Sequence, residues 1–320
     1  MRLALAGDTM LGRGVAEAIE AKGPTSLFAP GIRDLLSDAD LVVLNLECCI
    51  SNRGERWPDP RKPFFFRAPL TAAETLLDLG VDCVTLANNH ALDFGVEALA
   101  DTLEVLSDAG IATTGAGRNV EEARRPAILD GNGRRLCFVG VTDHPADFAA
   151  GSRPGVAFAD LQGGQTPTWL TDLISDLAED CDDVIVTPHW GPNMTTTPRS
   201  HVRAAARSFL EAGATLIAGH SAHVFHGIDW PVLYDLGDFV DDYAVDPQLR
   251  NDLGLLWLVD FDASGPKRVE VVPLALDFCF TRLANDDESA WIATRFRRAC
   301  AEFDTEVHET STGSLVTGPI

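Results

Sequence analysis

The sequence predicts an α/β protein in which two sheets pack together with helices on the outside. Apolar runs typical of buried strands alternate with amphipathic stretches typical of helices along most of the chain. From residue 224 to residue 276 the pattern becomes all-β, which favours a second sheet. With 320 residues, of which 46% are apolar and 23% charged, the chain can bury a large core. We find no repeat or linker, so we expect one domain over residues 1–280, with a helix and polar tail over 281–320 packed on it or trailing it.

The first half shows strands and helices in alternation. Pro69 suits the first turn of a helix, and Gly110 suits the end of one. The segment Asp130-Gly-Asn-Gly133 predicts a hairpin turn between two strands. The expected strands cover residues 3–6, 41–46, 81–86, 111–114, 126–129 and 135–141, and the expected helices cover 31–37, 69–79 and 96–109. Residues between the first strand and the first helix are expected to form a loop.

The second half repeats the alternation after a Gly/Pro-rich loop and then changes to strands. Helices are expected at 169–180 and 201–212, and strands at 184–187, 214–218, 232–236, 254–261 and 268–276. An acidic helix is expected at about 286–303. The polar tail that follows is expected to fray.

Composition excludes several classes of partner. The net charge of −23 argues against nucleic acid and against anionic membrane surfaces. No run of about 18 apolar residues exists, so no membrane span is expected. The N-terminus resembles a core strand and not a signal peptide, so we expect a cytoplasmic protein or one trimmed of its leader. The seven cysteines show no C-x-x-C pair, and those in apolar runs are expected to be buried reduced thiols: Cys48, Cys49, Cys83 and Cys137.

Polar residues follow several of the predicted strands. Asp8 ends the first strand, where open α/β sheets hold ligands, although a turn or helix cap is an alternative role. Glu47 lies between an apolar run and two cysteines, so it would be buried, and a metal is the most economical partner for a buried carboxylate. In Asn88-Asn89-His90, the asparagines alone could build a turn, but Asp93 is close enough to orient the imidazole of His90.

Three histidines also follow strands. His189 comes after the strand at 184–187, and His220 and His223 come after the strand at 214–218. Imidazoles at strand ends can gather a transition metal, although paired histidines are also found as ordinary surface or core residues. The other four lack this setting and are expected to be structural or surface residues: His144, His201, His226 and His308.

The chain resembles the CapA (poly-γ-glutamate capsule synthesis) family, which belongs to the calcineurin-like metallophosphoesterase superfamily. The resemblance runs from about residue 2 to about residue 242. It rests on Gly7-Asp8-Thr9-Met10-Leu11-Gly12-Arg13, Asn45-Leu46-Glu47, Phe66-Arg67-Ala68-Pro69, Asn88-Asn89-His90-x-x-Asp93-x-Gly95, His189-Trp190-Gly191 and Gly219-His220-x-x-His223-Val224. The resemblance implies a four-layer α/β/β/α sandwich of the metallophosphoesterase type, with a two-metal centre between strand ends.

The resemblance also implies a role for each matching residue. Asp8 and His223 would bind the first metal, and Glu47 would bridge the two metals. The second metal would be bound by Asn89, His189 and His220. His90 would donate a proton or stabilise an anion, with Asp93 orienting it. One or two divalent ions per chain, Mn, Fe or Zn, are therefore expected.

The sequence departs from the family pattern at the first metal and near the last motif. Met10 stands where the superfamily has histidine, and a thioether is a poor ligand for Mn²⁺ or Fe, so the first site is expected to bind weakly or to remain empty. Asp235 and Asp238 replace other residues in a segment resembling Ser-Leu-Gly-Asn-Phe-Val, and the sequence offers no reason for either. Such carboxylates would discourage a highly anionic substrate unless cations offset them.

Three further residues are candidates for contact with substrate. Arg13 and Arg67 would offset negative charge, because an arginine fork suits a phosphate and a carboxylate equally well. Asn45 is the third candidate. Trp57 and the aromatic run at 64–66 lie beside the motifs, where they would line a pocket or pack in the core.

These observations favour a metal-dependent hydrolase in which an activated water attacks a phosphoester or a γ-glutamyl-type amide. The substrate would be a small-molecule or peptide-like anion. Two other hypotheses remain open: a metal-independent acid/base enzyme, such as an epimerase, on the same scaffold, and a non-catalytic binding protein.

Overall fold

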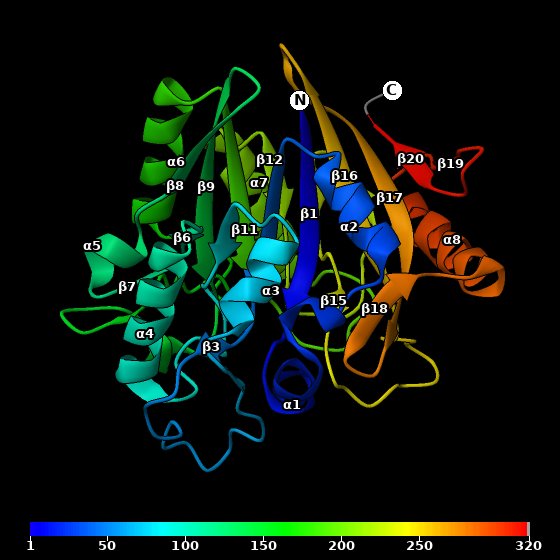
Figure 1. Ribbon diagram of the computed structural model, residues 1–320. Helices are drawn as coiled ribbons and strands as arrows, with labels where there is room; N and C mark the ends of the chain where they lie inside the picture. Colours follow the sequence, from blue (N-terminus) through cyan, green and yellow to red (C-terminus); the bar gives the residue numbers. More distant parts are fainter. Residues whose placement is uncertain (319–320) are drawn as a thin grey trace.

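The computed structural model, which describes residues 1–318, is a mixed α/β protein with two large sheets (Figure 1). In the ten-stranded sheet, β1 (Arg2–Thr9) pairs in parallel with β2 (Leu41–Leu46) and antiparallel with β16 (Leu253–Asp262). The remaining strands of this sheet are β5 (Cys83–Thr85), β6 (Ala112–Thr114), β15 (Asp238–Val240), β17 (Gly265–Asp277), β18 (Phe280–Leu283), β19 (His308–Glu309) and β20 (Leu315–Thr317). The parallel strands β1, β2, β5 and β6 are adjacent and in sequence order.

The second sheet has six strands in the order β13-β14-β12-β11-β9-β8. They are β8 (Ala127–Gly131), β9 (Arg134–Thr142), β11 (Asp183–His189), β12 (Leu216–Ala218), β13 (Ile228–Asp229) and β14 (Val232–Leu233). β9, β11, β12 and β14 are mutually parallel, and β8 forms the predicted hairpin with β9. Two short pairs lie outside both sheets: β3 (Cys49–Ile50) with β4 (Arg67–Ala68), and β7 (Ala116–Gly117) with β10 (Gly155–Val156).

Strand alternation divides the core into clusters on opposite faces of the sheets. On β1, Leu3 and Leu5 join a cluster with Phe138 of β9 and Ile185 of β11, so that cluster lies between the two sheets. Ala4 and Ala6, which point the other way, pack in a second cluster with the helices α1 (Arg13–Lys22), α2 (Pro30–Ser37), α3 (Ala72–Asp78) and α4 (Gly95–Asp108). A third cluster joins the outer face of the six-stranded sheet to α6 (Thr168–Asp180) and α7 (Ser200–Glu211).

The C-terminal segment packs on the same sheets. α8 (Asp286–Ala301) begins with a capping box between Asn285 and Glu288, and it buries Ile292 and Phe296 in the cluster between the sheets. β20 pairs with β17 through Leu315, which is buried. The expectation of a frayed tail is therefore wrong for the residues up to 318, because apolar side chains in the tail complete the edge of a sheet. The last two residues of the tail lie outside the described part of the chain.

Two further expectations are corrected. The segment expected to be a loop after the first strand contains α1, whose short helical pattern buries only Val15 and Ile19. Cys137 is not a free thiol, because it forms a disulfide with Cys181. The other cysteines are free and buried, as expected for Cys48, Cys49 and Cys83. Within residues 1–318 no helix is both long enough and apolar enough to cross a membrane.

Candidate metal centre

The ends of parallel strands from both sheets meet at one edge of the protein. Asp8 lies near the end of β1, and Glu47 follows β2 directly. On the other sheet, His189 is the last residue of β11 and forms a β-bridge with His220, which follows β12. The predicted polar strand ends therefore come together, four of them within ion-pair distance of a neighbour.

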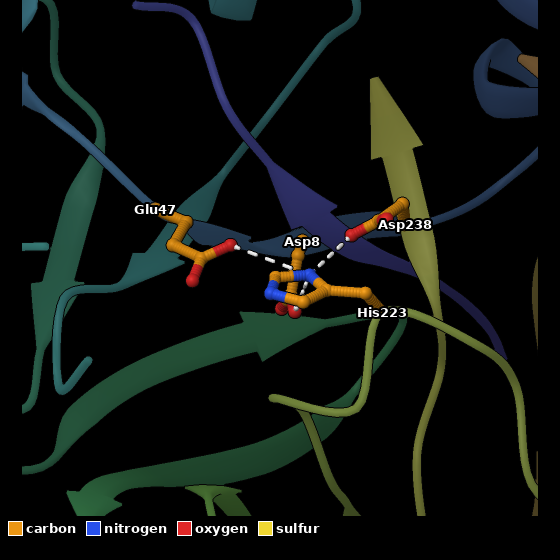
Figure 2. Close-up of side chains that lie close together, drawn as sticks. All are labelled: Asp8, Glu47, His223 and Asp238. Carbon is orange, nitrogen blue, oxygen red and sulfur yellow. Dashed lines mark hydrogen bonds and ion pairs between the residues drawn. The ribbon is translucent and has the colours of Figure 1, made fainter. Parts of the chain in front are cut away.

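Four buried side chains form the centre of this edge: Asp8, Glu47, His223 and Asp238 (Figure 2). One nitrogen or oxygen of each lies within 4.8 Å of those of the other three. The Nδ1 atom of His223 is 2.9 Å from Asp238 Oδ1, 3.5 Å from Asp8 Oδ2 and 4.0 Å from Glu47 Oε2. Three carboxylates and one imidazole converging on one point make a group that could hold a metal ion.

Asp238 reaches this centre because it is the register partner of Asp8 between the parallel strands β1 and β15. Met10 does not line the centre, because its side chain is in the core cluster beneath the helices and its Sδ accepts the N–H of Gly12. The sequence analysis showed that Met10 stands where the superfamily has histidine. It did not show that Asp238 lies in the group that could hold a metal. The available signal was the aspartate at 238 within a segment that resembles the family, and register decides where it points.

Asp235, which the sequence also left unexplained, supports the segment that carries the histidines. Its carboxylate accepts the N–H groups of Ala222 and Gly237, at 2.8 and 2.9 Å. The N–H of Ser221 points at Asp8 Oδ2, at 3.2 Å. Ser221 and His223 have φ values of 109° and 59°, in the region that favours glycine, so this backbone needs such hydrogen bonds to keep its shape.

A second set of groups adjoins the first through Glu47. Its Oε1 atom lies 3.4 Å from His189 Nε2 and 3.9 Å from His90 Nε2, while Oε2 faces His223. His220 Nδ1 lies 3.1 Å from Asp8 Oδ1. Asn89, the remaining predicted ligand, has a buried side-chain oxygen. Glu47 therefore lies between the two sets of groups, with one oxygen facing each.

Several buried polar atoms of these residues have no hydrogen-bond partner. These unpaired atoms include both oxygens of Glu47, both ring nitrogens of His189, Asn89 Oδ1 and Asp238 Oδ2. Buried polar atoms are normally hydrogen-bonded, because leaving one unpaired costs roughly 1–3 kcal/mol. Atoms of these types are ligands of divalent cations, so the donor set fits such an ion.

The local electrostatics agree with a shortage of positive charge. Burial and the neighbouring charge of Asp8 raise the pKa of Glu47 well above its usual value. Burial and the charge of Asp241 raise the pKa of Asp238 in the same way. Burial opposes the ionisation of Asp8 too, but His220, His189 and His223 together outweigh burial and lower the pKa of Asp8. Cations would stabilise the charged form of the first two carboxylates.

The ring of His90 is hydrogen-bonded to Asp93. Its Nδ1–H donates to Asp93 Oδ2 at 2.7 Å, which leaves Nε2 directed toward Glu47. Burial lowers the pKa of His90 to about 4, against the opposing effect of Asp93. Lys62, which sequence reasoning missed, forms an ion pair with Asp93 at 2.9 Å and donates to the carbonyl of Asn89 at 2.7 Å. No motif marks Lys62, because it lies in the irregular loop at 51–66.

A pocket of about 290 Å³ opens beside His90 and Asn89. Aromatic walls come from Trp57, Phe64 and Phe148. Of the aromatic run, Phe64 therefore lines the pocket, whereas Phe66 is buried in the core and stacks on the ring of His90. Trp57 and Phe148 meet edge to face, at 4.9 Å between ring centroids.

His144 also lines the pocket, with its ring 5.1 Å from that of His189. It follows β9, so it does have the strand-end setting that the sequence interpretation denied it. The error arose because Asp143 and His144 lie two and three residues beyond the apolar run. Asp143 accepts the N–H of Gly191 and pairs with His144 and His201, which ties both histidines to the edge of the site.

The side chains of the three residues predicted to contact substrate interact with other residues of the protein. Arg13 pairs with Asp242, and Arg67 lies over the ring of Phe94, so neither lines the pocket. Asn45 is fully buried, donates to Asp8 at 2.7 Å and accepts from Asn88 at 3.0 Å. This geometry gives Asn45 a means of positioning Asp8.

Comparison with known proteins identifies the family of this chain. Residues 2–243 match the family described as bacterial capsule synthesis protein PGA_cap. The chain belongs to this family. It is 28% identical over 365 residues to a probable polyglutamine synthesis accessory protein of Mycobacterium tuberculosis, covering 95% of this chain and 92% of that protein. It is 30% identical over 275 residues to the PGA biosynthesis protein CapA of Bacillus subtilis, covering 84% and 70%.

A solved structure of a hypothetical protein from Thermus thermophilus aligns with a TM-score of 0.48 at 16% identity. The alignment covers 85% of this chain and 98% of that one.

Proposed function

We propose that this member of the PGA_cap family is a metal-dependent hydrolase that uses an activated water to attack a phosphoester or a γ-glutamyl-type amide. The buried group Asp8, Glu47, His223 and Asp238, with its unpartnered oxygens, carries this proposal. The printed names of the two relatives refer to biosynthesis of PGA and to polyglutamine synthesis, which supports a glutamyl-type substrate. We also propose that the helices and two sheets form the four-layer sandwich of the metallophosphoesterase type.

Each set of donors would hold one ion. The first would be bound by Asp8, Glu47, His223 and Asp238, and the second by Glu47, Asn89, His189 and His220. Because oxygen outnumbers nitrogen in the first set, we expect it to prefer Mn²⁺ or Mg²⁺ over Zn²⁺. Cations held there would supply Lewis-acid chemistry: they would polarise the scissile group and lower the pKa of a bound water.

Residues of the chain would position the substrate and transfer a proton during the reaction. The pocket beside His90 would hold the part of the substrate next to the scissile bond. His90 would accept a proton from the attacking water at Nε2 and pass it to the leaving group, since Nδ1–H is held by Asp93. The aromatic walls would exclude water from the leaving group, because they cover the pocket with apolar surface.

Metal content and metal affinity test the centre independently of any substrate. Protein purified without chelator is expected to hold one or two metals per chain by elemental analysis, and metal-free protein is expected to bind Mn²⁺ in calorimetry. His220→Ala should remove binding at the second set, and Asp238→Asn should weaken binding at the first. His308→Ala is the matched control, because its side chain is 76% exposed and far from these residues in the fold.

Activity is then measured on bis(p-nitrophenyl) phosphate and on γ-glutamyl-p-nitroanilide, with and without Mn²⁺. Cleavage of either compound that depends on Mn²⁺ and falls by about 100-fold or more in His90→Ala supports the proposal. Absence of bound metal, or activity that survives chelation, would contradict it and favour acid/base chemistry without metal. Metal binding without hydrolysis of any glutamyl or phosphoester compound would favour a binding protein.

A further inference from the structure

A groove of about 570 Å³ lies between α8 and two loops. Trp291, Arg295 and Arg298 project from α8, and Thr196, Thr197 and Gln248 line the groove from the loops. Its volume is in the range of small-molecule sites in proteins. None of these residues belongs to the candidate metal centre.

The two arginines of this groove lack carboxylate partners in the described part of the chain. Other arginines nearby are paired, such as Arg250 with Asp252 and Arg297 with Glu309. The chain carries a net charge of −23, so acidic groups are in excess overall. Glu302 also lines the groove, so two guanidinium groups face one carboxylate.

Arg295 is held in an environment that disfavours an uncompensated charge. Burial lowers its pKa to about 10, and its buried Nη2 has no hydrogen-bond partner. Its Nη1 donates to the carbonyl of Leu249, which is neutral. An unpaired charge at such a position is costly unless an anion approaches it.

The remaining walls suit a flat apolar group. The ring of Trp291 lies 5.5 Å from the guanidinium carbon of Arg295, and Ala290 and Ala299 leave space beside it. The hydroxyls of Thr196 and Thr197 and the amide of Gln248 add donors and acceptors. An aromatic face, guanidinium forks and neutral polar groups together recognise an anion attached to a planar body.

We propose that this groove binds a small molecule that carries a phosphate or carboxylate group on a flat apolar body. The site does not depend on the proposed hydrolase function. The groove adjoins the segment that carries His223, because the guanidinium of Arg295 lies over Phe225, at 5.0 Å from the ring centroid, two residues after His223. His226 of the same segment donates to the carbonyl of Thr195, beside the groove.

Binding is tested by calorimetry on the full chain as purified, with phenylphosphonate and benzoate as the two anionic probes. Saturable binding of at least one probe is expected. Inorganic phosphate, which lacks the flat apolar body, and benzamide, which lacks the anionic group, should each bind at least tenfold more weakly. Arg298→Ala should weaken binding about tenfold or more, because a charge-assisted hydrogen bond is lost. Arg297→Ala removes the same charge one residue away, outside the groove, and should leave the dissociation constant unchanged.

The two arginine variants decide the result. Equal loss in Arg297→Ala and Arg298→Ala would show that general charge attracts the probes and would overturn the proposal, as would binding that neither variant alters. Absence of saturable binding of both probes would also overturn it. Stronger binding of phenylphosphonate would identify a phosphate site, and stronger binding of benzoate a carboxylate site. Because Arg298 is exposed, its variant tests the groove without disturbing the core.

Discussion

Replacement of Lys62 by methionine tests how firmly the loop at 51–66 is bound to the candidate site. The ammonium group contacts Asp93, whose side chain is fully buried, and Lys62 itself is only 13% exposed. Methionine keeps most of the apolar stem but leaves the carboxylate of Asp93 without its cation. Removing one partner of a buried ion pair costs about 3–5 kcal/mol, so the free energy of unfolding should fall by that amount.

Thermal unfolding would register this loss clearly. With an unfolding entropy of about 2 cal/mol/K per residue, the expected decrease in Tm is about 5–8 °C for the whole chain. Lys267→Met is the matched control, because Lys267 is 61% exposed and lies 3.8 Å from Asp262. That exposed pair should contribute less than about 1 kcal/mol.

A double-mutant cycle separates the ion pair from packing. In an Asp93→Asn background, Lys62→Met should cost much less, with a coupling energy of about 2 kcal/mol between the two positions. Equal changes in Tm for Lys62→Met and Lys267→Met, or a coupling energy near zero, would refute the role assigned to Lys62.

Three further outcomes are expected. Burial lowers the pKa of His226 to about 4 in the folded protein, below its unfolded value near 6.5, so its stabilising contribution is complete above pH 6.5 and is lost as the pH falls toward 4. In urea unfolding, the difference in the free energy of unfolding between pH 7.5 and pH 5 should therefore be smaller for His226→Gln than for the wild type. Equal differences in the two proteins would contradict this. Phe138→Ala, between the two sheets, should lower the free energy of unfolding by about 3–5 kcal/mol in the same assay, and a loss below about 1 kcal/mol would be inconsistent with its burial. Gly219→Ala should reduce Mn²⁺ affinity, because a Cβ there would lie 2.1 Å from the carbonyl oxygen of Tyr234, whereas Gly151→Ala meets no atom within 4 Å and should bind as the wild type does.

Hydrophobic pattern and strand-end residues were enough to predict the framework of this protein. The strand expected at 41–46 is β2 with the same bounds, and the polar residues expected to converge at strand ends lie together. Both results follow from local rules, since burial sets the strand pattern and parallel strands end at one edge. The failures have a different origin. α1 buries only two side chains, too few for a clear helical period, and β20 is stabilised by pairing with a strand far away in sequence.

The side chains that complete the site were harder to predict for the same physical reason. Asp238 joins the centre through its register with Asp8, which is fixed by long-range pairing and not by any feature of residues 234–240. Lys62 reaches Asp93 from an irregular loop, where neither periodicity nor a motif places a side chain. Arg13 and Arg67 were predicted to contact an anion. In the structure Arg13 forms an ion pair with Asp242, and the guanidinium of Arg67 lies over the ring of Phe94. Sequence identifies which groups are available, and tertiary pairing decides which of them meet.

The two sheets contribute separate halves of the candidate centre. Asp8, Glu47 and Asp238 belong to the ten-stranded sheet or follow its strands, whereas His189 and His220 belong to the six-stranded one or follow its strands. Neither sheet alone assembles both donor sets, so a partly folded chain in which the sheets have not docked would not show the native affinity for metal. Metal affinity would thus report the completion of folding. An ion bound between the sheets would also act as a cross-link. It would resist separation of the sheets at the edge where their strands end, beyond the hydrophobic cluster that lies between them.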